Sequence, residues 1–293
     1  MKYEAICIYS PEHSVRKMCE VLGLRECGYY QWLRRLEKNR VKREEERILA
    51  KRISEVFIEN KEIYGYRKMQ RELIKTAIYL SEYRVRKIMK ETGLYPVILK
   101  KYKPTHNGKN DGRFYSNIIK QNFTAKEPNN VWSGDITYIK TNQGYVYLAT
   151  IIDLYNREVV GYSISKNIDS DLAKKALGNA LIRVNTKESK IIFHSDRGCQ
   201  YSSKAYQHML NEYGIRGSMS RPGCPYDNAC SESFFSSAKR ECIYRKNYLT
   251  IEEVKRDLFE YIELFYNRKR MHASLGYMSP VEYRLSNMYE KAS

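Results

Sequence analysis

The chain of 293 residues is long enough for more than one domain with a buried core, and its net charge of +18 favours a polyanionic partner. It has no signal peptide and no apolar run of about 18 residues, so we expect a cytoplasmic protein that binds nucleic acid and not lipid. The seven cysteines form no Cys-x-x-Cys pair, which disfavours a disulfide framework or a common zinc module. Zinc bound by Cys224, Cys230 and His194 is kept as an alternative.

The first 125 residues carry most of the excess charge, with 28 Lys and Arg against 15 Asp and Glu. Within them, residues 11–36 predict a short helix, a turn near Gly23 and a second helix. This order is typical of a helix-turn-helix, whose second helix would place Arg34 and Arg35 in a DNA groove. The alternative is a helical hairpin whose aromatic side chains form its core.

Residues 37–60 combine many charges with apolar residues at helical spacing, which predicts a long amphipathic helix that completes a first domain over 1–60. A second helix-turn-helix-like DNA-binding region is predicted over 61–96, with helices near 65–75 and 81–92. The later helix is basic, and its candidate DNA contacts are Arg84, Arg86 and Lys87. Contact with phosphates alone, without reading of bases, is the alternative.

Residues 97–128 are rich in Lys, Asn, Gly and Pro and predict a basic linker. Residues 129–245 instead show the pattern of an α/β domain, in which a three-stranded antiparallel meander is followed by helices that alternate with strands. The expected strands are 131–140, 145–153, 157–165, 190–195 and 215–220, and the expected helices are 169–184, 202–213 and 228–243.

The tail, residues 246–293, begins with a capping signal at Thr250 and Glu253. An apolar helical face follows, which predicts a C-terminal helical segment packed on the core. Its basic residues Arg268 and Arg270 are candidate DNA contacts.

Three carboxylates within 129–245 lie where a metal site is usually built. Asp135 belongs to the first predicted strand and Asp196 ends the fourth, while Glu232 lies on a predicted helix with Lys239 on the same face. Such carboxylates, together with substrate phosphates, suffice to hold Mg²⁺, and two ions about 3.5–4 Å apart can promote phosphodiester cleavage. A chance triplet in an acid-containing chain is the alternative.

The order Asp135, Asp196 and Glu232, with 35 residues between the last two and Lys239 seven positions later, resembles the DDE transposase and integrase core. The surrounding segments WSGDITYI, FHSDRGCQYSS and DNACSESFFSSAKREC are similar to OrfB transposases of the insertion-sequence-three family of bacterial mobile elements. The resemblance extends over nearly the whole chain. In that family pattern Asp153 lies outside the triad, so we interpret it as a structural strand-end cap.

The resemblance implies an α/β ribonuclease H-like catalytic core with a mixed five-stranded sheet, preceded by an all-α helix-turn-helix DNA-binding region. It also implies a polynucleotidyl transferase in which Asp135, Asp196 and Glu232 hold two Mg²⁺ or Mn²⁺ ions. Such an enzyme binds element terminal repeats in double-stranded DNA, cuts a 3′ end and joins it to another strand by transesterification. The expected DNA contacts beside the carboxylates are Lys239, Arg197 and Asn228.

Members of this family usually act as a fusion with an upstream OrfA, which supplies a coiled coil for oligomerisation, and this chain has no heptad run of that kind. We therefore expect a homo-oligomer on DNA and an OrfA partner or fusion. Two other functions are weighed against the transposase. A plain nuclease of ribonuclease H type is disfavoured by the basic N-terminal region, and a non-catalytic DNA-binding regulator would not need an intact triad.

Overall fold

The computed structural model describes residues 1–97, 114–184, 190–221 and 225–292 of the chain. It contains two compact units, Met1–Pro96 (unit 1) and Val97–Ser293 (unit 2). Half of the predicted linker, residues 98–113, and Cys224 of the zinc alternative lie outside the described residues. Among the described residues, no helix is both long enough and apolar enough to cross a membrane.

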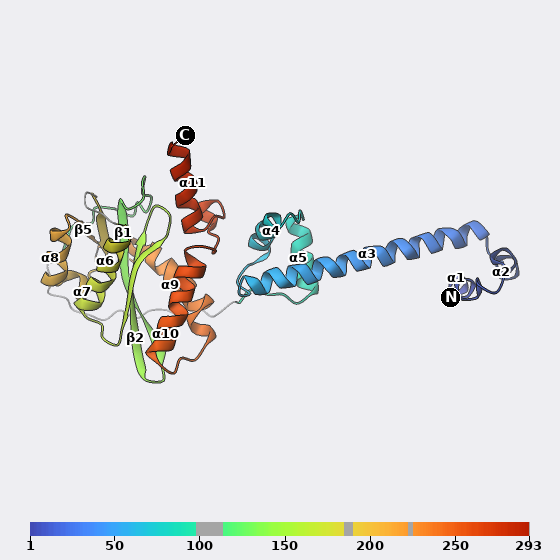
Figure 1. Cartoon of the computed structure of the whole chain (residues 1–293), viewed down its shortest axis with the longest axis horizontal. Helices are drawn as coiled ribbons and strands as arrows, with labels where there is room; N and C mark the ends of the chain where they lie inside the picture. Colours follow the sequence, from blue (N-terminus) through green and yellow to red (C-terminus); the bar gives the residue numbers. More distant parts are fainter. Residues whose placement is uncertain (98–113, 185–189, 222–224, 293) are drawn as a thin grey trace. The chain divides into compact units, whose positions relative to one another are not determined.

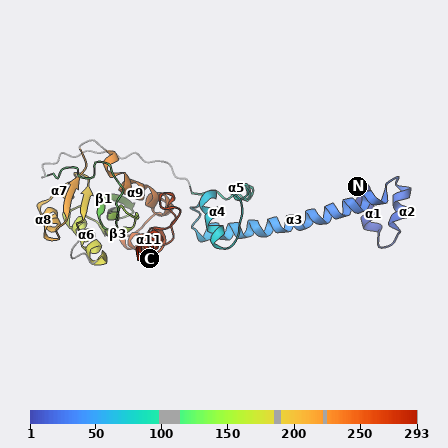
Figure 2. The ribbon, with the colours of Figure 1, turned by 90° about the horizontal axis from the view of Figure 1, so that it is seen from above.

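Unit 1 is helical throughout, and one long helix connects its two ends (Figures 1 and 2). Its elements are α1 (Lys2–Tyr9), α2 (Val15–Val21), α3 (Glu26–Glu59), α4 (Tyr66–Lys75) and α5 (Glu82–Glu91). The predicted helix, turn and helix are present, with Gly23 at a φ of +66° in the turn between α2 and α3. The prediction of separate helices in 11–36 and 37–60 is wrong, because α3 runs through both segments for 34 residues.

Helices α1 and α2 lie at one end of α3, and α4 and α5 lie at the other (Figure 1). A small apolar core is buried at each end. At the first, Tyr29 is 3% exposed and packs beside Trp32, with Ile6 and Cys19 buried around it. The aromatic residues here are therefore partly core, as the helical-hairpin alternative expected. The second core joins the C-terminal part of α3 to α4 and α5, and its buried side chains are Ile53, Val56, Phe57, Met69, Leu73, Val85 and Ile88.

Residues 34–48, between the two cores, are exposed all round the helix. The segment contains no glycine or proline, and Arg47 pairs with Glu44 at 3.0 Å on its surface. Exposed pairs of this spacing contribute a few tenths of a kcal/mol to a helix. Local propensity and charge pairing, and not burial, therefore hold the middle of α3.

Unit 2 contains the predicted mixed five-stranded sheet, with strand order β3-β2-β1-β4-β5. The strands are β1 (Val131–Thr141), β2 (Gly144–Asp153), β3 (Val159–Ser165), β4 (Ile192–Ser195) and β5 (Arg216–Met219). The first three form the expected antiparallel meander, and β4 and β5 extend the sheet in parallel from β1. This is the ribonuclease H-like arrangement that the resemblance implied.

Helices cover both faces of the sheet. They are α6 (Ser170–Val184), α7 (Cys199–Ser202), α8 (Lys204–Glu212), α9 (Ala229–Glu241), α10 (Ile251–Phe259) and α11 (Pro280–Ala292), with a π-helical segment, η3 (Glu260–Tyr266), after α10. The helix predicted over 202–213 is present as α8, and α7 is an additional short helix before it. The backbone is extended at Ser203, which separates α7 from α8, and its Oγ accepts a hydrogen bond from the Tyr206 amide.

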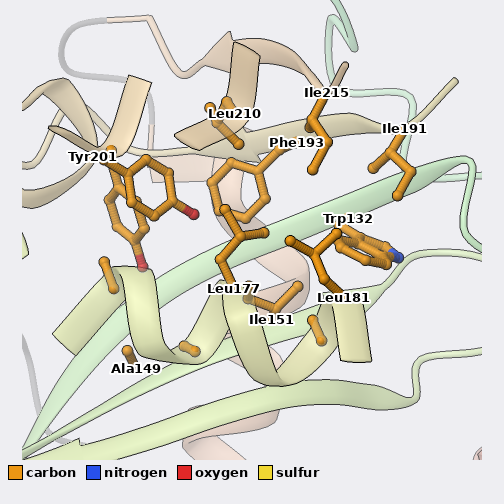
Figure 3. Close-up of a cluster of buried hydrophobic side chains, with 14 of the residues drawn as sticks. Trp132, Ala149, Ile151, Leu177, Leu181, Ile191, Phe193, Tyr201, Leu210 and Ile215 are labelled. Carbon is orange, nitrogen blue, oxygen red and sulfur yellow. The ribbon is translucent and has the colours of Figure 1, made fainter. Parts of the chain in front are cut away.

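Alternation along β1 assigns its side chains to two layers. Trp132 points into the core under α6, together with Ile151, Leu177 and Phe193 (Figure 3). Ser133, the next residue, faces α9. Because Asp135 is two residues beyond Ser133, β1 directs it to the α9 face as well.

Candidate active site

The parallel pairing of β1 with β4 brings two of the predicted carboxylates together. Gly134 pairs with Ser195, so the next residue on each strand is Asp135 or Asp196. Local hydrogen bonds fix both side chains. Asp135 Oδ1 accepts from the Ile136 amide at 2.7 Å, and Asp196 Oδ1 accepts from the Gly198 amide at 2.9 Å.

Helix α9 adds the third carboxylate beside these two central strands. Ser133 Oγ donates to Asn228 Oδ1 at 3.0 Å and lies 2.9 Å from Ser231 Oγ, which fixes the start of α9 against β1. Glu232 follows Ser231 and is exposed, whereas Lys239, two turns later, is half-buried.

The electrostatics of Asp135 show that these groups act on one another. Burial raises the pKa of the Asp135 carboxyl well above its usual range, and the neighbouring charges of Asp196 and Glu232 raise it further. The Ile136 amide and the Lys239 ammonium oppose this shift. Burial also lowers the pKa of Lys239, while Asp135 raises it. The site therefore concentrates negative charge that a bound cation would neutralise.

The oxygen-rich donor set is the chemistry that Mg²⁺ and Mn²⁺ prefer. In the described part of the chain, however, no three His, Cys, Asp or Glu side chains form a ready-made metal cage. Asp135 and Asp196 are half-buried and Glu232 is exposed. Such a set fits Mg²⁺, which usually keeps several water ligands and takes others from substrate phosphates.

A buried polar network, not foreseen from the sequence, supports the segment that leads into α9. His194 Nδ1 lies 2.9 Å from Ser218 Oγ, and its Nε2 lies 3.0 Å from the Asp227 carbonyl oxygen. Burial lowers the pKa of His194, which favours the neutral ring. These bonds give His194 a positioning role. Because they engage both ring nitrogens, His194 is not available as a ligand in the zinc alternative.

Asp227 anchors the same segment from the other side. Its carboxylate accepts hydrogen bonds from Asn117, Gln121 and the Arg221 amide, each at 2.9 Å. Burial alone would raise the pKa of Asp227, but these donors and the Arg221 charge lower it. In the sequence, only the pair Asp227-Asn228, shortly before Glu232, pointed to this region. Nothing in the sequence indicated that Asn117 and Gln121 would bond to Asp227.

The predicted DNA contacts of unit 2 have different environments. Arg197 donates to the Ser220 carbonyl at 2.9 Å and lies over the Phe114 ring at 4.7 Å. Asn228 is 7% exposed and holds Ser133, so its geometry favours positioning of α9 over contact with DNA.

The tail shows the same division between its two arginines. Arg268 is exposed. Arg270, whose side chain is 11% exposed, makes two 2.7 Å hydrogen bonds to Glu241. This geometry favours a structural role for Arg270 over the predicted DNA contact.

Asp153 is placed as a structural cap. It is 1% exposed, and its carboxylate accepts from the Asn129 amide at 2.9 Å and the Tyr155 amide at 3.0 Å. In unit 1 the predicted DNA contacts are all exposed, and these are Arg34, Arg35, Arg84, Arg86 and Lys87.

Fold and site together define a nucleic-acid-processing core of the integrase type, joined to a helix-turn-helix-like region. Two family profiles described as integrase core domain match residues 125–225 and 232–288, and one described as HTH-like domain matches 43–102. The chain belongs to the transposases of the IS3 family of insertion sequences.

Similarity over nearly the full length establishes this membership. The transposase InsF for insertion sequence IS3A of Escherichia coli (strain K12) is 36% identical over 288 residues, which cover 98% of this chain and 100% of that one. The transposase for insertion sequence element IS904 of Lactococcus lactis subsp. lactis (strain IL1403) is 40% identical over 255 residues, or 87% of this chain and 99% of that one. Among solved structures, a chain of the simian T-cell lymphotropic virus intasome aligns at 17% identity with a TM-score of 0.47, over 73% of this chain and 70% of that one.

Proposed function

We propose that this transposase cuts and joins DNA at the ends of its own mobile element, with Asp135, Asp196 and Glu232 as its catalytic carboxylates. The observation that carries the proposal is the pairing of Gly134 with Ser195, which makes Asp135 and Asp196 neighbours. The effect of Glu232 and Lys239 on the pKa of Asp135 adds the helix α9 to the same site.

A divalent metal is the cofactor that such a core requires, and we assign two Mg²⁺ or Mn²⁺ ions to the three carboxylates. Bound there, the ions would supply Lewis-acid stabilisation of the attacking and leaving oxygens of a phosphodiester. The protein itself orients the carboxylates through the Ile136 and Gly198 amides.

The remaining groups bind and orient DNA. Lys239, half-buried beside Asp135, is assigned to a phosphate next to the scissile bond, and exposed Arg268 to the flanking backbone. The helix-turn-helix-like region is assigned to the terminal repeats, through the exposed basic residues at the start of α5. Cutting two element ends together favours a homo-oligomer on DNA, with OrfA as fusion or partner.

The test is cleavage and joining of labelled DNA that carries the element's own ends, in Mg²⁺, in Mn²⁺ and in chelator. The wild type is compared with Asp196→Asn and with Asp171→Asn, an equivalent change at an exposed surface aspartate. We expect metal-dependent 3′-end cleavage and joining that Asp196→Asn abolishes and Asp171→Asn retains. Binding without cleavage, even when OrfA is supplied, would instead support the regulator.

A further inference from the structure

The β1–β2 hairpin carries an exposed aromatic pair beyond the carboxylates. Tyr138 lies on β1 three residues after Asp135, and its side chain is 41% exposed. Tyr145, on β2, is 53% exposed. Their ring centroids are 5.6 Å apart with the planes at 88°, an edge-to-face pair. The two tyrosines thus support each other at the surface and contribute little to the core.

Lys239 connects this pair to the active site. Its Nζ lies 5.1 Å from the centroid of the Tyr138 ring, within the range of a cation–π contact. The same ammonium interacts electrostatically with Asp135. Lys239 therefore links the Tyr138 ring to Asp135, while part of that ring stays accessible.

A cation beside an accessible aromatic ring matches the two parts of a nucleotide. The ammonium suits a phosphate, and the ring suits the face of a base, which stacks on aromatic side chains with little regard to its identity. A base presents its face only where it has left the duplex stack, and such extrusion is how enzymes reach buried positions of DNA. Paired bases inside a duplex are excluded by the same argument.

We propose that Tyr138, Tyr145 and Lys239 form a nucleotide platform that holds an unstacked base of the DNA end next to the scissile phosphate. The inference rests on the proposed function, because it assigns a DNA contact to the same site. In this arrangement Lys239 binds the phosphate, Tyr138 stacks on the base, and Tyr145 holds the Tyr138 ring upright.

Photocrosslinking locates the base without any need for catalysis. Asp196→Asn protein is bound to end DNA that carries 5-iodouracil at one position at a time on either strand. We expect crosslinks to Tyr138 or Tyr145 from one position beside the cleavage site. Crosslinks to these tyrosines from no position, or equally from many, would overturn the platform. Because the readout is crosslinking and not cleavage, the outcome does not depend on whether the carboxylates are assigned correctly.

A binding cycle separates stacking from a purely structural effect. Tyr138→Leu on normal DNA, and the unchanged tyrosine on DNA lacking that one base, should each lose at least about fivefold in affinity. Combining the two changes should lose no more than either alone, because both remove the same contact. Additive losses would mean that Tyr138 acts elsewhere.

Two further variants complete the cycle. Tyr138→Phe keeps the ring and should bind normally, so a loss as large as that of Tyr138→Leu would count against stacking. Tyr213→Leu is the matched control, because Tyr213 is 48% exposed and lies before the first residue of β5. The other end of β5, where Met219 pairs with Ser195, is the end next to Asp196. Tyr213→Leu should leave both affinity and crosslinking unchanged.

Discussion

Ser133 of β1 donates a hydrogen bond to Asn228, the residue before α9, and so connects the strand of one proposed catalytic carboxylate to the helix of another. The contact is buried, with a second hydroxyl, that of Ser231, at 2.9 Å. The relative position of Asp135 and Glu232 therefore depends on a side-chain contact between residues nearly a hundred positions apart in the sequence.

The carboxylate on α9 gives the first prediction. Glu232→Gln should lower strand cleavage by about a hundredfold or more, because the amide keeps the shape but removes the charge needed to hold a cation. Affinity for end DNA should change little, as Glu232 is exposed and makes no part of the core. Gel-based cleavage and binding assays measure the two effects. Glu252→Gln, on the exposed surface of α10, is the control, and equal loss of binding would refute the assigned role.

The ion pair between Arg270 and Glu241 gives the second. Both side chains are about nine-tenths buried, so Arg270→Ala leaves a buried carboxylate without its partner. We expect the free energy of unfolding to fall by about 3–5 kcal/mol, measured by urea denaturation. Arg268→Ala removes an exposed arginine two residues away and should alter stability by about 0.5 kcal/mol or less, while weakening DNA binding. Equal stability of the two variants would contradict the structural role of Arg270.

The third prediction concerns pH. Burial raises the pKa of Asp153 to about 6, above its value near 4 in an unfolded chain. The folded state therefore holds this proton more firmly than the unfolded state. The resulting stability is complete below about pH 4 and is lost as the pH rises through 6, a change of about 3 kcal/mol. Asp153→Asn should remove this part of the slope, whatever constant offset it adds. Identical slopes in wild type and variant, from denaturation at pH 4 to 7, would rule the effect out.

Two glycines give the fourth. A Cβ on Gly161 of β3 would lie 2.4 Å from the Ala176 carbonyl oxygen and 2.6 Å from the Ala180 Cβ. Gly161→Ala should therefore force α6 away from the sheet and lower the free energy of unfolding by about 1–3 kcal/mol or more. A Cβ on Gly178, within α6, meets only the Met209 methyl at 3.9 Å. Gly178→Ala should thus stabilise the helix by about 0.5–1 kcal/mol, and thermal denaturation of both variants checks the opposite signs.

Sequence periodicity predicted the sheet well because each of its strands lies in one well-defined environment, between helices on both faces of the sheet. The antiparallel meander follows from alternation and from the short turns between strands, and the Asp-to-Glu spacing pointed to the proposed site. What the sequence could not give were partners distant along the chain. The bonds from Asn117 and Gln121 to Asp227 depend on where a predicted linker returns to the core. Arg270 looked like a surface cation because Glu241 is 29 positions away.

The continuity of the long helix across residue 36 was missed for a different reason. Helices were predicted on both sides of that point, but residues 34–48 have no buried side chain to mark them as one element with their neighbours. The helix continues there because nothing in the segment breaks it and both ends are anchored in cores. The continuity of the helix follows from the two cores at its ends and cannot be predicted from the sequence of residues 34–48 alone.

An uninterrupted α3 fixes the distance between the two cores of unit 1. From Tyr29 in one core to Val56 in the other, 27 residues at 1.5 Å each correspond to about 40 Å. A four-residue insertion in the exposed middle would displace one core from the other by about 6 Å and rotate it by about 40°. If both ends grip DNA, the distance between the two bound segments is set by the number of residues in a single helix, and length variants of that helix would change the spacing of the DNA sequences the protein accepts.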